Sequence, residues 1–196
     1  MTNHVQKLIR LLIIPLYAAL VFALKEALAF LPNIEVVTFL LAFGALVFPL
    51  YMGLSISFLF GSLEIMLYSS GTWVLLYFTA WPLLVIIIWT LQKIIKQYWW
   101  IFVVITSLWG FMFGTFDALL HLIMFGKNTF YVYWIAGIVF DGVHGVSNFM
   151  FSAFLYKPIM LLWNQQLSHF IINDNKIIDE KIIHQVKSTL PSCNYY

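Results

Sequence analysis

Charged residues are scarce in this chain. Only 9% of its 196 residues are Asp, Glu, Lys or Arg, while 63% are hydrophobic and the mean hydropathy is +0.94. A soluble domain has about 25% charged residues, so this chain has too few charges to cover a surface that faces water. The scarcity excludes an ordinary cytosolic enzyme, a nucleic-acid-binding protein and a disordered protein.

Cysteine is nearly absent too. The single Cys193 excludes a disulfide framework and a zinc site built from cysteines. The sequence also lacks the glycine-rich phosphate-binding loop of ATPases, the HExxH metal motif and the flanks of a nucleophile elbow, each of which positions a particular catalytic group. We therefore expect a protein that is not an enzyme and has no catalytic residue, cofactor or resident metal.

Apolar runs, in contrast, fill most of the chain. Broken by turn residues and charges, they predict six membrane-spanning helices, at about residues 8–31, 36–51, 54–67, 73–91, 99–125 and 130–163. A single helix over residues 36–67 would be roughly 48 Å long, too long for one crossing, so we expect two short helices that separate near Pro49 and Gly53. Pro82 is expected to kink the fourth helix, and three glycines would let the sixth bend: Gly137, Gly142 and Gly145.

The basic residues predict the orientation. With six spans and the N-terminus inside, Lys25 and Lys127 lie on or near the outer side and the other Lys and Arg residues lie in the cytoplasm. This bias predicts that both termini are cytoplasmic. We expect an all-α fold, with a six-helix membrane domain over residues 1–163 and a polar cytoplasmic tail over residues 164–196 that holds a weak amphipathic helix near residues 177–186.

Ionisable side chains interrupt the predicted spans. Each costs about 2.5–3.5 kcal/mol to insert, so such groups usually face a cavity or a partner. Residues three or four apart share one helix face, as Asp117 does with His121 and Asp141 with His144. Because these groups lie towards the outer side in the predicted orientation, we expect a substrate-binding pocket that opens to the exterior. Its predicted residues are Asn33, Glu35, Glu64, Trp73, Asp117, His121, Tyr133, Trp134, Asp141, His144 and Asn148.

Structural roles stay open for these residues. An Asp and a His at helical spacing can simply satisfy each other as a buried pair. Aromatic residues at the outer end, Trp73, Tyr133 and Trp134 among them, are typical of the belt at the lipid headgroups, although one or two of them could stack on a ligand. The first helix has small residues four apart, Ala19 and Ala23, a spacing that lets another helix approach closely, within this chain or from a partner.

Three stretches of the sequence resemble a known family. They are FLPNIEVVT at residues 30–38, WGFMFG at residues 109–114, and YWIAGIVFDGVHGVSN at residues 133–148, which leads to Lys157 and Pro158. In these stretches the chain is similar to the substrate-binding S components of energy-coupling factor (ECF) vitamin transporters, over about residues 8–163. The first and third look most like the cobalamin-type branch.

The resemblance implies a carrier subunit of a bacterial ABC importer. Such a subunit binds its vitamin from outside in a pocket closed by the loop after the first helix, here residues 32–35. It then tilts in the lipid bilayer against a transmembrane coupling subunit that two cytoplasmic ATPase subunits drive. The family's Ala-x-x-x-Ala coupling motif on the first helix corresponds to Ala19 and Ala23.

Two other functions remain open from the sequence. In a stand-alone proton-coupled transporter, Asp117, Asp141 or Glu64 would carry the proton and a histidine would relay it. In a haem-bearing redox protein, His121 and His144 would be the iron ligands, and a visible absorption band would reveal them.

Overall fold

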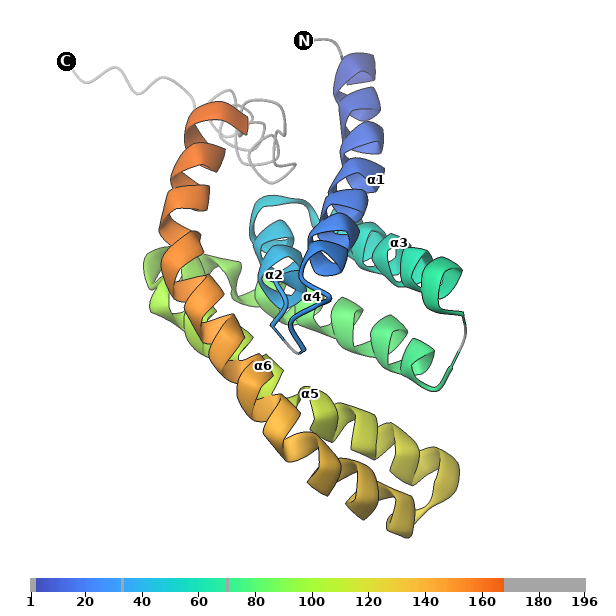
Figure 1. Cartoon of the computed structure of the whole chain (residues 1–196). Coiled ribbons are helices and arrows are strands. Elements are labelled where there is room, and N and C mark those ends of the chain that lie inside the picture. Colours follow the sequence, from blue (N-terminus) through green and yellow to red (C-terminus); the bar gives the residue numbers. More distant parts are fainter. Residues whose placement is uncertain (1–2, 33, 70, 168–196) are drawn as a thin grey trace, which may run out of the picture.

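The computed structural model describes residues 3–32, 34–69 and 71–167. These residues form helices and connections, with no strand among them. Six α-helices follow one another along the chain (Figure 1): α1 (Asn3–Ala27), α2 (Val37–Val47), α3 (Leu50–Tyr68), α4 (Trp73–Gln97), α5 (Trp100–Phe125) and α6 (Lys127–Leu162), with a short π-helical turn at Trp163–Leu167.

Five of these helices are long and apolar enough to cross a membrane. They are α1 from Leu8, α3, α4, α5 and α6 with the turn that follows it. This confirms the prediction of a helical protein with several apolar helices long enough to span a membrane. The tail from residue 168, with its predicted amphipathic helix and Cys193, lies outside the described residues.

Helix α2 is the centre of the fold. It has 11 residues, and Val37 to Leu46 are all buried, as expected of a helix that is apolar on every face. It contacts all five other α-helices. The predicted break between the second and third helices is confirmed at Pro49, whose backbone is extended and which lacks the N–H needed to continue a helix. Gly53, the other predicted break, lies within α3.

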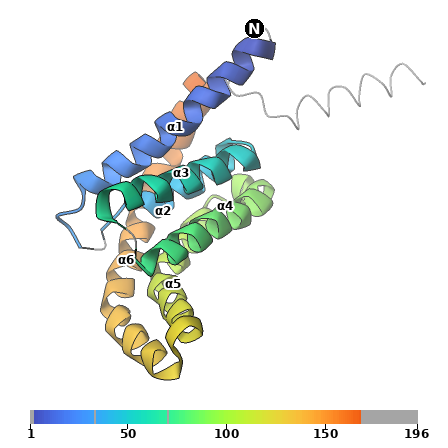
Figure 2. The same ribbon diagram turned by 90° about the vertical axis from the view of Figure 1, so that its right-hand side faces the viewer.

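The other helices form two units around α2. Helix α3 packs against both α1 and α4, whereas α5 and α6 pair along their lengths. Figures 1 and 2 show α5 and α6 as a hairpin that extends away from α1, α3 and α4. The turn of this hairpin is Gly126, with a φ of 89° in the left-handed region that glycine adopts readily.

Several predicted boundaries differ from the observed ones. Helix α1 ends at Ala27 instead of residue 31, because two hydrogen bonds of the i→i−3 type, Leu28 to Lys25 and Ala29 to Glu26, tighten its end into turns. Helix α4 continues past residue 91 to Gln97, with Pro82 inside it. Helix α6 runs through its glycines as one helix of 36 residues that curves along its course (Figure 1).

Glycines bring α5 and α6 into backbone contact. A Cβ atom on Gly110 would lie 2.8 Å from the Cα of Gly145 and 2.6 Å from Nδ2 of Asn148. A Cβ on Gly114 would lie 2.7 Å from an oxygen of Asp141. Small residues at such spacing allow close helix packing in a membrane. This close approach determines which polar groups of α6 meet α5.

Candidate functional site

A partly buried ion-pair network joins the end of α1 to the end of α3. The Lys25 ammonium donates to Oε2 of Glu64 at 2.5 Å and to Oε1 of Glu26 at 3.1 Å. Tyr68 donates its hydroxyl hydrogen to the other oxygen of Glu26 at 2.6 Å, and the Lys25 nitrogen lies 4.4 Å from the centre of the Tyr68 ring. We call these four residues the Lys25 cluster.

The local sequence explains why this network forms. Glu64 lies in an apolar helix and its side chain is only 2% exposed, so its charge needs a cation and hydrogen bonds. Lys25 lies in the last turn of α1, where the helix dipole favours a positive charge. Because α1 and α3 pack together, the cation and the carboxylate meet.

The connection between α1 and α2 adds a third carboxylate near this network. Glu35, whose side chain is 18% exposed, has Oε1 3.6 Å from Nε2 of His144 on α6. The same His144 nitrogen lies 3.4 Å from the Thr38 hydroxyl of α2. Burial raises the pKa of Glu35 to about 7, with the Lys25 charge lowering it and the Glu64 charge raising it further. We call Glu35, Thr38 and His144, together with the Lys25 cluster, the loop site.

Other predicted residues gather within the α5–α6 hairpin. The Nδ1–H of His121 donates to the backbone carbonyl of Asp117 at 2.9 Å, and the Asp117 carboxylate lies 3.5 Å from the same nitrogen. The His121 ring stacks on the Tyr133 ring with centroids 3.7 Å apart. We call these three residues the hairpin group. Trp134 stacks on Phe130 of its own helix.

Asp141 and Asn148 hold α6 against α5. The Asp141 carboxylate accepts a hydrogen bond from the backbone N–H of Gly114 at 2.7 Å, in the space that the missing Cβ leaves. Asn148 is fully buried and donates to the backbone carbonyl of Thr106 at 3.2 Å. These contacts tie both side chains to α5, although Oδ1 of Asn148 has no hydrogen-bond partner among the described residues.

Aromatic side chains form a continuous set of contacts between α4 and the loop site. Trp73 meets Tyr77 edge to face, and Tyr77 meets Trp81 in the same way. Trp81 stacks on Phe113 of α5, which in turn meets the His144 ring. Trp73 is thus connected to the loop site through other rings. Asn33 lies outside the described residues.

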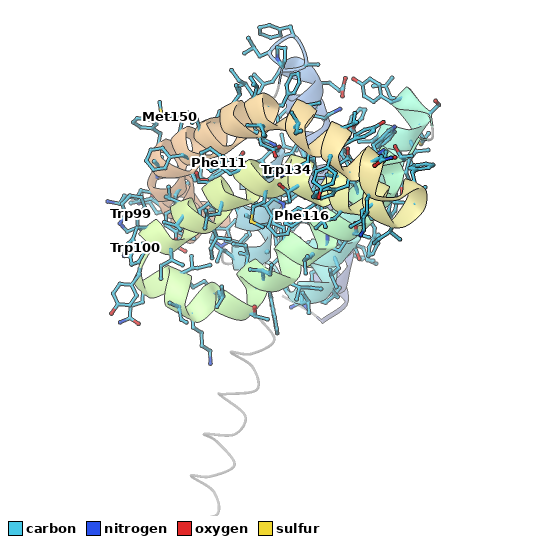
Figure 3. The ribbon with its side chains drawn as sticks, turned by 90° about the horizontal axis from the view of Figure 1, so that it is seen from below. Trp99, Trp100, Phe111, Phe116, Trp134 and Met150 are labelled. Carbon is cyan, nitrogen blue, oxygen red and sulfur yellow. The ribbon has the colours of Figure 1, made fainter. Side chains whose placement is uncertain are left out.

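An apolar groove of about 670 Å³ lies along α6. Phe111 of α5 and Met150 of α6, both labelled in Figure 3, line it together with Ile34 of the connecting loop. None of the ten predicted binding residues that the structure describes lines this groove. In a multi-span protein, such a surface is suited to lipid.

The described residues contain no group of three or more His, Cys, Asp and Glu side chains that could hold a metal ion. His121 and His144 have separate partners, Asp117 and Tyr133 for the first and Glu35 and Thr38 for the second. The proposed pair of haem ligands therefore gains no support from their contacts.

Sequence reasoning placed Lys25 at the outer end of the first helix but missed it as part of the site, together with Glu26, Thr38 and Tyr68. A signal was present: one Lys and one Glu, Lys25 and Glu64, interrupt apolar helices at the same predicted side. Opposite charges within spans usually pair. Sequence reasoning also missed the close approach of α5 and α6 at Gly110 and Gly114. The spacing of these two glycines, four residues apart, could have indicated it.

The predicted docking residues lie on the free face of α1. Ala19 and Ala23 are exposed, whereas Ala18 and Val21 on the opposite face are buried. The exposed face is apolar and continuous, with leucines beside the alanines at positions Leu12, Leu16, Leu20 and Leu24.

No protein-family model, curated protein or solved structure matches the chain. Its function is therefore argued from its own residues.

Proposed function

We propose that this chain is the membrane-embedded, substrate-binding subunit of an ECF-type ABC importer in a bacterial plasma membrane. It captures a vitamin outside the cell, and the resemblance of the sequence favours cobalamin. It delivers the vitamin by tilting against a transmembrane coupling subunit that two ATPase subunits drive. The chain itself carries no catalytic residue in this proposal.

The loop site is the observation that carries the proposal. It joins Lys25 to Glu26 and Glu64, and it adds the Glu35–His144 contact within electrostatic reach of Lys25 and Glu64. All of these groups lie at the side predicted to face outwards. Ionisable groups within a bilayer are costly and usually mark a functional site. A connecting loop that contributes Glu35 to the site is suited to cover a bound solute.

The free face of α1 supports the docking part of the proposal. Ala19 and Ala23 are exposed, and small residues four apart allow a partner helix to approach closely. The coupling subunit would pack here without displacing any contact of the loop site.

The proposal includes six crossings with both termini in the cytoplasm. Figure 1 shows the start of α1 and the end of α6 at the same end of the molecule, which supports an even number of crossings. In this arrangement α2 would supply the sixth crossing, as a short helix whose 11 residues are fewer than the roughly 20 that usually cross a membrane.

Reconstitution tests the proposal. We expect the purified chain to retain a small molecule that mass spectrometry identifies, and proteoliposomes to take up that molecule only with the coupling subunit, the ATPases and ATP present. Omission of the ATPases, or a hydrolysis-deficient ATPase, is the control. Uptake by the chain alone on a proton gradient would contradict the proposal.

One observation favours the alternative of a stand-alone proton-coupled transporter. Burial raises the pKa of Glu35 to about 7, so this carboxyl group exchanges its proton near neutral pH, next to His144. The same proteoliposomes distinguish the two functions, since only the alternative needs a pH gradient and no ATP.

A further inference from the structure

The loop site holds more negative than positive charge. Lys25 is the one lysine or arginine in the contacts that the structure describes for it, and Glu26 and Glu64 both accept hydrogen bonds from its ammonium group. Glu35 adds a third carboxyl group within electrostatic reach of Lys25 and Glu64. When all three are ionised, one lysine cannot neutralise them.

One carboxylate oxygen of the site also has no partner. Glu64 is 1% exposed, and its Oε1 has no hydrogen-bond partner among the described residues, although its Oε2 binds Lys25. A buried charged acceptor without a hydrogen-bond donor is unfavourable, because it has lost water and gained no partner. Glu64 thus offers a position for one more donor, next to the excess negative charge.

We infer that the loop site binds an organic cation, with the positively charged nitrogen of the ligand against Glu64 and Glu35, beside Lys25. This inference rests on the proposed solute-binding function and narrows its substrate class. It favours a solute with an ammonium group or a charged nitrogen heterocycle over the cobalamin that the sequence resemblance suggests.

Aromatic rings near the site are suited to such a ligand. The Tyr68 ring already lies under the Lys25 ammonium at 4.4 Å, and Tyr77 of α4 is within electrostatic reach of Glu35 and Glu64. Cations bind to aromatic faces within about 6 Å. Tyr68 itself is 47% exposed.

Glu35 links cation binding to pH. Burial raises its pKa to about 7, and the groups that face it are Lys25 of α1, Glu64 of α3, Tyr77 of α4 and His144 of α6. A bound cation stabilises the ionised form, so binding releases the proton. Affinity for a cation should then rise about tenfold from pH 6 to pH 8, and Glu35→Gln should remove this dependence.

Three probes of one shape test the inference on the full chain in detergent or nanodiscs: benzylamine (a cation), benzyl alcohol (neutral) and benzoate (an anion). We expect benzylamine to bind roughly tenfold more tightly than benzyl alcohol at pH 7.5, and benzoate to bind least. Glu64→Gln should remove the preference for benzylamine over benzyl alcohol.

Lys25→Met tests the competing cation. This variant should strengthen benzylamine binding, because it removes the lysine ammonium group from the carboxylates. Lys127→Met is the matched control and should leave benzylamine binding unchanged.

Equal affinities for benzylamine and benzyl alcohol would overturn the inference, as would a preference that persists in Glu64→Gln. If Lys25→Met does not fold, the test is the pH dependence of benzylamine affinity in Glu35→Gln and in the unaltered chain. The same pH dependence in both would overturn the inference. The failure of the proposed function has a different signature: cation binding with no ATP-dependent uptake by any coupling complex. Uptake of a neutral vitamin without cation preference would overturn this inference alone.

Discussion

Single polar side chains are accommodated inside this protein in different ways. Glu64 is neutralised by Lys25 across two helices, Asp141 accepts a backbone N–H from a neighbouring helix, and His121 stacks on Tyr133 and binds a carbonyl of its own helix. Glu35 has no such direct hydrogen bond among those described and lies close to His144. Burial raises its pKa to about 7, so its protonation changes near neutral pH.

A prediction follows for the pH dependence of stability. The ordinary pKa of Glu35 is 4.5 and burial raises it to about 7. Between these values the folded protein keeps a proton that the unfolded chain releases, so this residue lowers stability as the pH rises, by at most about 1.4 kcal/mol per pH unit. Thermal unfolding from pH 5 to pH 7.5 should show a flatter profile for Glu35→Gln. Parallel profiles would refute the assignment.

A glycine pair tests the contact between α5 and α6. Gly110→Ala places a methyl group 2.6–2.8 Å from atoms of Asn148 and Gly145, and such overpacking destabilises by about 1–3 kcal/mol. We expect a lower thermal midpoint for this variant in detergent.

Gly142→Ala is the matched control, since a Cβ there meets nothing within 4 Å. It should leave stability unchanged or raise it by up to about 1 kcal/mol, because alanine favours a helix. Similar midpoints for the two variants would mean that the helix backbones do not touch at Gly110.

At the scale of elements, α1 is the helix with most of its surface uncovered. One face packs on α3 through buried residues such as Val21, and the other presents Ala19 and Ala23. Since neither alanine contributes to the loop site, the proposed docking and the proposed solute binding can be tested separately.

We therefore expect Ala19→Trp or Ala23→Trp to abolish ATP-dependent uptake while leaving benzylamine affinity unchanged. A large side chain on this face would prevent close approach of a partner helix. Ala136→Trp is the control, because Ala136 is an equally exposed small residue on α6. Normal uptake by the two α1 variants would exclude docking at this face.

At the scale of the whole molecule, six of the predicted binding residues form two separate groups. Glu35, Glu64 and His144 belong to the loop site, whereas Asp117, His121 and Tyr133 form the hairpin group on the extended α5–α6 pair. The fold places only the first group against α1 and α3.

His144 and His121 make a matched pair to test this division, because each is 2% exposed. His144→Ala should weaken benzylamine binding roughly 2- to 10-fold through loss of a polar contact to Glu35. His121→Ala should leave binding within twofold, measured by titration of the purified chain. A larger effect at His121 would place the ligand in the hairpin instead.

Much of the fold could be predicted because hydrophobicity and backbone chemistry act locally. The apolar runs define the long helices, and Pro49 ends one helix since it lacks an N–H. The short, wholly apolar α2 was predicted as a separate helix, yet its burial at the centre depends on what packs around it. The ends of α1 and α4 were predicted less well, because helix ends depend on local hydrogen bonds and neighbouring turns.

The sequence by itself determined that this is a multi-span helical membrane protein with ionisable groups inside its spans, because composition and apolar run length depend on no partner. Only the tertiary structure decided which groups meet. Lys25 pairs with Glu64 because α1 packs on α3, and Asp141 is held by α5 because Gly114 leaves room for it. Helix spacing along the sequence sets the face of a residue, but the rotation and packing of neighbouring helices select its partner.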